Sequence, residues 1–178
     1  SMNFYENWLC TNPNLDSNCT KTEKTMCVEG KDEVYFVDSC GNRANIYDAS
    51  KVDDEEYWSR VVAKEESCGA DGANVESRDC GNCVYPVSRC GKGEASYGEN
   101  VCLSLDCPDA PSNKGVQDRV NGESWCVYDG YIGDGKDIVG SRHWKYYCHD
   151  GEVKTEPCAD YRQEICTEGE SVEGDFSF

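Results

Sequence analysis

The chain contains few of the residues that build a large hydrophobic core. Leu, Ile, Val and Phe together make up 28 of its 178 residues, about 16 %. Too few aliphatic side chains are present for one large core. No apolar stretch approaches the roughly 20 residues that a transmembrane helix needs, so we expect no membrane span in this segment.

Positive charge and histidine are also scarce. The 35 acidic residues outnumber the 17 basic ones, and the formal net charge is −18. Such a surface repels phosphate, so we expect no nucleic-acid partner. The two histidines are His143, expected to be half-buried beside a tryptophan, and His149, expected on a solvated turn. With no Gly-x-Ser-x-Gly motif and no phosphate-binding loop, we expect no catalytic residues and no enzyme.

Low aliphatic content with high net charge is typical of disordered chains, but the cysteine content points elsewhere. Fourteen cysteines in 178 residues approach the density of disulfide scaffolds. We expect all of them to form disulfides: Cys10, Cys19, Cys27, Cys40, Cys68, Cys80, Cys83, Cys90, Cys102, Cys107, Cys126, Cys148, Cys158 and Cys166.

Zinc is the alternative use of these cysteines. The single Cys-x2-Cys pair is Cys80 and Cys83, and Cys68 or Cys90 with Cys102 would complete a four-thiolate site. Nothing in the spacing requires such a site, and disulfides are the preferred interpretation.

Seven disulfides would require an oxidising compartment, so we expect an extracellular or cell-surface protein. The first five residues lack the basic and apolar regions of a signal peptide. We therefore expect a segment of a longer secreted protein.

A run with two prolines and a glycine predicts a linker at 108–115. It would separate a disulfide-rich β module at 3–107, with ten cysteines, from a second at 116–167, with four. Residues 168–178 are expected to form an acidic tail. Both cysteine counts are even, so each module could close its own disulfides.

The predicted fold class is small, disulfide-rich and mainly β, with long loops and one short helix. Runs of β-branched and aromatic residues predict strands at 33–37, 127–128, 137–139 and 143–148. Asp150-Gly151 after the last of these indicates a hairpin turn. Acidic residues followed by Arg60 and Lys64 predict the helix at 53–64.

One loop has the composition of a calcium site. Asp129, Asp134 and Asp137 lie within nine residues that also contain three glycines. Ca²⁺ takes six to eight oxygen ligands, often several carboxylates with backbone carbonyls. The spacing matches no EF-hand, and an ordinary Gly-Asp turn explains the same residues. No cofactor is expected, and calcium at this loop is the alternative.

Aromatic residues suggest a contact surface in the C-terminal part. In a strand at 143–148, Trp144 and Tyr146 would share one face and Tyr147 the other. An exposed Trp-Tyr pair could stack on a sugar ring or anchor a protein partner. The preferred interpretation is that this pair forms the core of a small sheet with few aliphatic residues.

Three stretches carry a resemblance to known sequences: 40–48 with the following Tyr57-Trp58, 124–130, and 139–144 with 156–166. They resemble cysteine-rich segments of large predicted surface proteins from uncultivated archaea. The resemblance covers about two thirds of the chain. It implies an extracellular location and a modular parent protein, and it carries no functional residue over.

Together these observations predict a non-enzymatic extracellular module of a larger cell-surface or secreted protein. Its role would be structural, adhesive or in recognition, with a protein or glycan partner at the cell surface. The alternatives are a secreted hydrolase acting on glycans and a calcium-dependent or sugar-binding module. A deep cleft with two facing carboxylates would favour the hydrolase.

Overall fold

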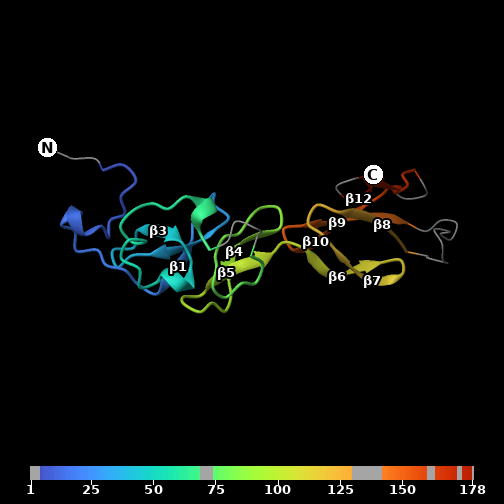
Figure 1. Cartoon of the computed structure of the whole chain (residues 1–178). Helices are drawn as coiled ribbons and strands as arrows, with labels where there is room; N and C mark the ends of the chain where they lie inside the picture. The colour runs from blue at the N-terminus through green and yellow to red at the C-terminus, as the bar shows by residue number, and fades with distance from the viewer. Residues whose placement is uncertain (1–4, 69–73, 130–141, 160–162, 172–173, 178) are drawn as a thin grey trace. The chain divides into compact units, whose positions relative to one another are not determined.

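The computed structural model describes residues 5–68, 74–129, 142–159, 163–171 and 174–177 (Figure 1). The chain divides into two units, Ser1–Ser104 and Leu105–Phe178. The described residues are mainly β, which confirms the predicted fold class. No helix among them is long and apolar enough to cross a membrane.

Unit 1 is built on two small antiparallel sheets. Strands β1 (Lys24–Cys27), β2 (Val34–Val37) and β3 (Arg43–Ile46) form the first, in that order. Strands β4 (Ser88–Lys92) and β5 (Asn100–Ser104) form the second. In the described part of unit 1, 3₁₀ helices of one turn each accompany them, at Pro13–Leu15, Ala49–Lys51 and Lys64–Glu66. Strand β2 confirms the strand predicted at 33–37.

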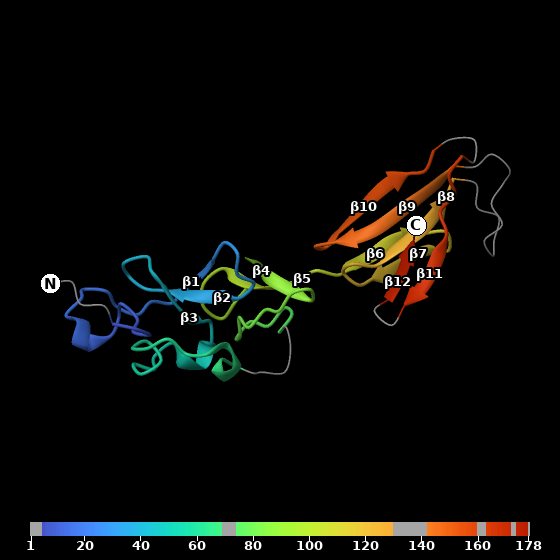
Figure 2. The ribbon, with the colours of Figure 1, turned by 90° about the horizontal axis from the view of Figure 1, so that it is seen from above.

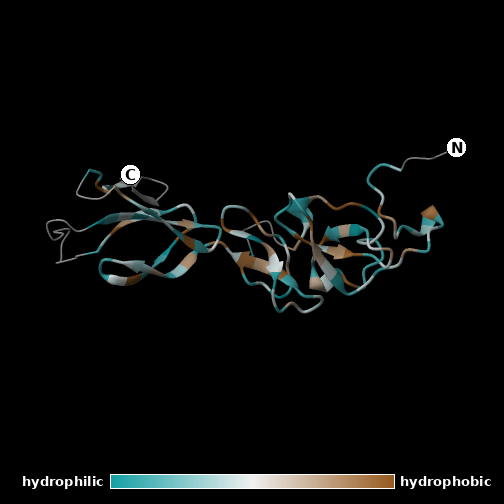
Figure 3. Cartoon of the chain, turned by 180° about the vertical axis from the view of Figure 1, so that it is seen from behind, coloured by the Kyte–Doolittle hydropathy of each residue, from teal (hydrophilic) through white to brown (hydrophobic). Residues whose placement is uncertain are grey.

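Aromatic residues occupy the centre of unit 1. Phe36 of β2 lies edge-on to Tyr47, with ring centroids 5.1 Å apart, and 5.0 Å from Trp58. Burying one such ring removes as much apolar surface from water as burying an aliphatic side chain or more. Figure 3 shows that hydrophobic residues occur along the chain in short stretches between hydrophilic ones. A few large rings therefore replace the missing aliphatic residues.

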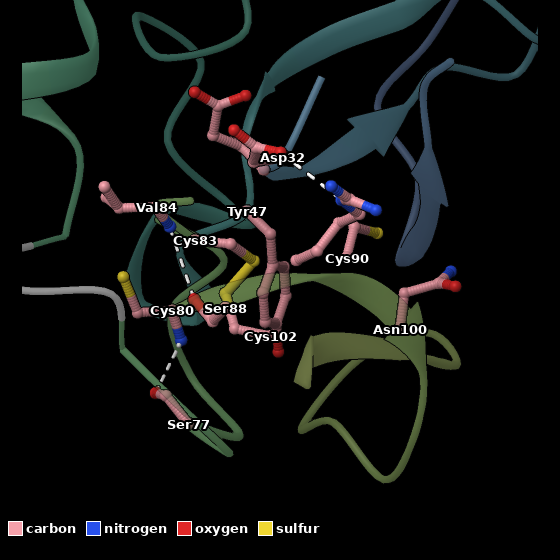
Figure 4. Close-up of a disulfide and its surroundings, with 12 residues drawn as sticks. Asp32, Tyr47, Ser77, Cys80, Cys83, Val84, Ser88, Cys90, Asn100 and Cys102 are labelled. Atoms are coloured by element: carbon pink, nitrogen blue, oxygen red, sulfur yellow. Dashed lines mark hydrogen bonds and ion pairs between the residues drawn. A yellow bond between two sulfur atoms is a disulfide. The ribbon is translucent and has the colours of Figure 1, made fainter. Parts of the chain in front are cut away.

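A disulfide is part of this core. Cys83 and Cys102 are bonded to each other and fully buried, within the same cluster as Phe36 and Tyr47. Figure 4 shows the bond beside the Tyr47 ring. The Tyr47 hydroxyl donates a hydrogen bond to the Arg78 carbonyl, 2.9 Å away. The half-cystines thus fill space that would otherwise require aliphatic side chains.

The Cys80–Cys83 segment does not bind zinc. Cys80 is bonded to Cys68, and Cys83 is bonded to Cys102. Gly81 between them lies against β2, where the Val34 N–H donates to its carbonyl at 2.9 Å. A β-carbon on Gly81 would lie 2.5 Å from the β-carbon of Val34. The Cys-x2-Cys spacing therefore reflects a close passage of two backbones.

The predicted helix at 53–64 is wrong. Residues in this stretch form turns, in which the Asp54 side chain accepts from the Glu56 N–H at 3.0 Å. Beyond the turns, Arg60 forms a β-bridge with Trp8. Residues 60–62 do not form a helix, because their backbone groups bond to the N-terminal segment and to the Asn45 side chain. Tertiary pairing thus overrides a local helical pattern.

The described residues of unit 2 form the strands β6 (Cys107–Ser112), β7 (Gly115–Arg119), β8 (Ser124–Tyr128), β9 (His143–His149), β10 (Glu152–Pro157), β11 (Glu168–Ser171) and β12 (Gly174–Ser177). Strands β10, β9 and β8 form an antiparallel sheet, and β6–β7 and β11–β12 are hairpins (Figure 2). Strand β6 contacts β8 and β10, and β12 contacts β8. The predictions at 127–128 and 143–148 are confirmed, whereas 137–139 lies outside the described residues.

The turn between β9 and β10 is the one predicted from Asp150-Gly151. Asp150 has φ 51° and Gly151 has φ 80°, and His149 pairs with Glu152 across the turn. Two consecutive residues of positive φ match the right-handed twist of a hairpin.

The core of unit 2 is centred on one tryptophan. Trp125 of β8 is 1 % exposed and donates from Nε1 to the Pro111 carbonyl at 2.7 Å. The Arg119 guanidinium lies over its ring, 4.9 Å from the centroid. The Cys107–Cys148 disulfide and Tyr146 pack beside it.

Two of the predicted boundaries differ from the structure. Residues 108–115 lie in the β6–β7 hairpin and are not a linker, since Ala110 pairs with Gln117 and is buried in the unit 2 core. The expected tail at 168–178 contains the β11–β12 hairpin, and Glu168 accepts from the Cys126 N–H at 2.8 Å. The two units instead meet between Ser104 and Leu105.

Twelve cysteines form six disulfides, each within one unit: Cys19–Cys40, Cys27–Cys90, Cys68–Cys80, Cys83–Cys102, Cys107–Cys148 and Cys126–Cys166. Cys10 and Cys158 are unpaired, so the prediction that all fourteen are oxidised is wrong for these two. The structure divides the chain between Ser104 and Leu105, so Cys107 belongs to unit 2 and not to unit 1. Each unit then has an odd number of cysteines and retains one free thiol.

Candidate ligand-binding groove

The proposed calcium loop lies largely outside the described residues, which exclude Asp134 and Asp137. Asp129 is described, and its carboxylate accepts a hydrogen bond from Nε1 of Trp144 at 2.8 Å. This residue therefore holds the indole of β9.

The aromatic pair on β9 has two different environments. Tyr146 packs against Trp125, with centroids 6.0 Å apart, and belongs to the unit 2 core. Trp144 is half-buried, and the Arg142 guanidinium lies 5.6 Å from its ring centroid. Both side chains are half-buried, and Trp144 is the one that does not pack against the unit 2 core cluster.

The histidines also differ. His143 is 8 % exposed and accepts at Nδ1 from the Cys166 N–H, 3.1 Å away. Its ring lies 4.5 Å from that of Tyr128. His149 is exposed at the end of β9. His143 therefore has a structural role in anchoring the Cys126–Cys166 region.

Cys19, Asp38 and Cys40 place potential metal-ligating atoms close together. The two sulfurs are bonded to each other, so neither is a thiolate ligand. The Asp38 carboxylate accepts from the backbone N–H groups of Cys40 at 2.9 Å and Asn42 at 2.8 Å. It stabilises the β2–β3 turn, and this cluster does not form a metal site.

A groove on unit 1 is lined by charged, aromatic and thiol side chains. We call it the Glu33 groove: it is lined by residues 8–10, by Lys31, Glu33 and Tyr35, by residues 43–46, and by residues 61, 62 and 64. Its volume is about 490 Å³. The lining comes from β2 and the residues just before it, from β3, from the N-terminal segment and from residues 61–64.

Asn45 fixes the geometry of the groove. Its side chain donates to the Arg60 carbonyl at 2.9 Å and accepts from the Val62 N–H at 2.8 Å. The N-terminal segment then pairs with this stretch, because the Val61 N–H donates to the Asn7 carbonyl at 2.8 Å. Asn45 is 3 % exposed, so these bonds are largely protected from water.

An ion pair lies within the groove. Lys64 Nζ is 2.6 Å from a Glu33 carboxylate oxygen and 3.1 Å from the Cys83 carbonyl. The Tyr35 hydroxyl donates to the other Glu33 oxygen at 3.0 Å. Burial opposes ionisation of Glu33, but hydrogen bonds from Lys64, its own backbone N–H and Tyr35 outweigh it and lower its pKa.

The pKa of Tyr35, which donates a hydrogen bond to Glu33, is shifted in the opposite direction from that of Glu33. Burial, together with the hydrogen bond to the Glu33 carboxylate, raises the pKa of Tyr35 to about 12. Near neutral pH, Glu33 is therefore ionised and Tyr35 is protonated. Neither group is poised to exchange a proton with a substrate at that pH.

Two further cations line the groove. The Arg43 guanidinium lies over the Tyr35 ring, 5.2 Å from its centroid, and Lys31 is exposed. Neither has a carboxylate partner among the described residues. With Lys64, the groove holds three cations and one carboxylate, in a protein of net charge −18.

Aromatic surface forms part of the groove lining. Trp8 is 39 % exposed, and its ring is stacked on Tyr5 with centroids 4.8 Å apart. The free thiol of Cys10 belongs to the same lining and is exposed.

Sequence reasoning did not find this groove. Its residues come from four stretches separated by up to about twenty residues, and none carries a motif. Tyr35 was expected only as part of a strand. Comparison with protein-family models, curated proteins and solved structures finds no match, so the Glu33 groove itself is the basis for assigning a function.

Proposed function

We propose that this chain is a non-enzymatic extracellular recognition module of a larger secreted or cell-surface protein, and that it binds its ligand in the Glu33 groove. The observation that carries the proposal is the groove itself: a volume of about 490 Å³ with an exposed indole and two cations that have no carboxylate partner among the described residues. Cavities of this size with a few convergent polar groups are typical binding sites.

The chemistry of the lining favours binding over catalysis. A glycan-acting hydrolase uses two carboxyl groups facing each other about 5–10 Å apart. The lining contains one carboxylate, Glu33, and its lowered pKa and its ion pair with Lys64 keep it ionised. A general acid would need its pKa raised.

The disulfides support the proposed extracellular location. Six disulfides are typical of proteins that fold in an oxidising compartment and function outside the cytosol. The resemblance of three stretches to cysteine-rich segments of archaeal surface proteins favours the cell surface and a modular parent protein.

An array of extracellular oligosaccharides and short peptides tests the proposal. We expect the protein to bind a subset, and Trp8→Ala to lose that binding while Tyr85→Ala retains it. Tyr85 is a suitable control because it is 49 % exposed and lies outside the groove lining. Equal binding by Trp8→Ala, or breakdown of a bound oligosaccharide, would contradict the proposal.

A further inference from the structure

We infer that the Glu33 groove accepts a carboxylate-bearing glycan, such as an oligosaccharide of uronic acids. This inference rests on the proposed function and names the class of ligand. It is carried by the two cations that have no carboxylate partner among the described residues, by the indole platform and by the contacts that residues 57–62 make with β3.

The groove carries surplus positive charge. Lys64 is neutralised by Glu33 at 2.6 Å, which leaves Lys31 and Arg43 as the cations of the groove without a carboxylate partner among the described residues. The protein has only 17 basic residues against 35 acidic ones. A groove with surplus positive charge on such a surface attracts an anionic group and excludes a cationic one.

Arg43 is positioned to bind a carboxylate. Its guanidinium lies over the Tyr35 ring, which restricts the side chain by cation–π contact. The Tyr35 hydroxyl is in turn held by Glu33. A guanidinium whose face is stacked retains N–H donors at its edge, and these match a carboxylate in two parallel hydrogen bonds.

Trp8 provides an aromatic surface on which a sugar ring can stack. Trp8 is stacked on Tyr5 at an interplanar angle of 22°, and its backbone is fixed by the bridge to Arg60. A rigid, partly exposed indole offers a large amphipathic surface at low entropic cost. The apolar face of a sugar ring can lie on it while the carboxylate reaches a cation.

The contacts of β3 favour a glycan over an acidic peptide. An extended peptide commonly binds by adding a strand to an open sheet edge. The Ile46 carbonyl of β3 accepts a hydrogen bond from the Tyr57 hydroxyl, and the Asn45 side chain is bonded to Arg60 and Val62. Strand addition at this part of β3 would have to displace these contacts, so a ligand with a carboxylate on a ring fits better.

Cys10 provides a direct reporter. Its thiol is exposed and lines the groove, while Cys158, the other free thiol, belongs to unit 2 and serves as an internal reference. The rate of alkylation by iodoacetamide, a neutral reagent, is measured at both cysteines by peptide mass spectrometry. The probes are an oligogalacturonate, its methyl ester, which lacks the charge, and an oligoglutamate.

We expect the oligogalacturonate to slow alkylation of Cys10 and leave Cys158 unchanged, with weaker protection at high salt. The methyl ester should give no protection. Arg43→Gln should weaken oligogalacturonate binding at least about tenfold, because it removes a charged bidentate contact. Arg78→Gln is the matched control, since Arg78 pairs with Glu94 at 2.7 Å and lies outside the groove lining.

Three outcomes overturn the inference. Equal protection by the methyl ester would show that the groove does not recognise the charge of the ligand. The proposed function, ligand binding in the groove, would remain supported. Stronger protection by oligoglutamate would assign the groove to an acidic polypeptide. Absence of protection by all three probes also refutes the inference, and the proposed function then fails only if Trp8→Ala leaves array binding unchanged.

Discussion

Cys83 and Cys102 form a disulfide with no exposed surface, in contact with the aromatic core of unit 1. Cys19 and Cys40 form another, in which Cys19 is half-buried and Cys40 is exposed. The two bonds close chain segments of nearly equal length, with sequence separations of 19 and 21. The pair of bonds therefore separates the effect of a cross-link from the effect of burial.

Replacing each disulfide by two alanines should lower the free energy of unfolding by unequal amounts. Loss of the cross-link destabilises both variants by about 3 kcal/mol. The Cys83→Ala/Cys102→Ala variant should lose a further ~1–2 kcal/mol because it leaves a cavity in the core. Urea unfolding measures the difference, and equal losses would show that the buried sulfurs add nothing by packing.

The oxidation state of the cysteines gives a second prediction. Without reductant, two thiols per chain should react with iodoacetamide, at Cys10 and Cys158. Cys10 should react faster, because it is exposed, whereas burial, together with the nearby charge of Glu164, raises the pKa of the Cys158 thiol. Peptide mass spectrometry identifies the sites. Labelling at any of the other twelve would contradict the pairing.

The ion pair in the groove predicts a pH dependence. The pKa of Glu33 is lowered in the folded state, so its contribution is fully present above the unfolded-state pKa of about 4.3. It is lost as the pH falls through the lower folded-state pKa. Glu33→Gln should therefore be less stable than wild type at pH 7, by about 1–3 kcal/mol, and equally stable at strongly acidic pH.

Glu29→Gln is the control for this experiment, since Glu29 is exposed and lies outside the groove lining. Its stability should follow that of wild type across the pH range. A deficit of Glu33→Gln that persists unchanged below the folded-state pKa would contradict the ion-pair explanation.

The close passage at Gly81 predicts a steric effect. Gly81→Ala would place a β-carbon 2.5 Å from the Val34 β-carbon and 2.8 Å from its carbonyl oxygen. Because both neighbours belong to β2, we expect a loss of about 3 kcal/mol or more. Gly30→Ala meets nothing within 4 Å and should lose only about 1 kcal/mol, from its φ of +73°. Thermal unfolding compares the two.

The boundary between the units gives the last prediction. A protease site inserted after Ser104 should release two fragments without reductant, because each described disulfide lies within one unit. The same site inserted after Asn113 should leave the fragments linked through Cys107–Cys148. Non-reducing electrophoresis distinguishes these results. Separation after cleavage at Asn113 would restore the linker that the sequence suggested.

Local patterns in the sequence were sufficient for the fold class and for several elements. A run of β-branched and aromatic residues predicted β2, an aromatic-rich run predicted β9, and Asp150-Gly151 predicted the turn between β9 and β10. These signals are local, because side-chain alternation and positive φ depend on neighbours in the chain. The prediction of a helix at 53–64 was wrong because contacts with residues outside this stretch, Trp8 and Asn45, decide its conformation.

The cysteine count by itself established a disulfide-rich protein, but the pairing was decided by the tertiary structure. Whether Cys107 belongs to the first or the second unit changes the parity of both, and only the packing of β6 against Trp125 settles it. The groove has the same origin: Glu33, Arg43 and Lys64 meet because the Asn45 side chain and the Glu33–Lys64 ion pair join residues 60–64 to segments earlier in the chain. Contacts between residues far apart in the chain leave no periodic trace in the sequence, and the folded structure alone reveals them.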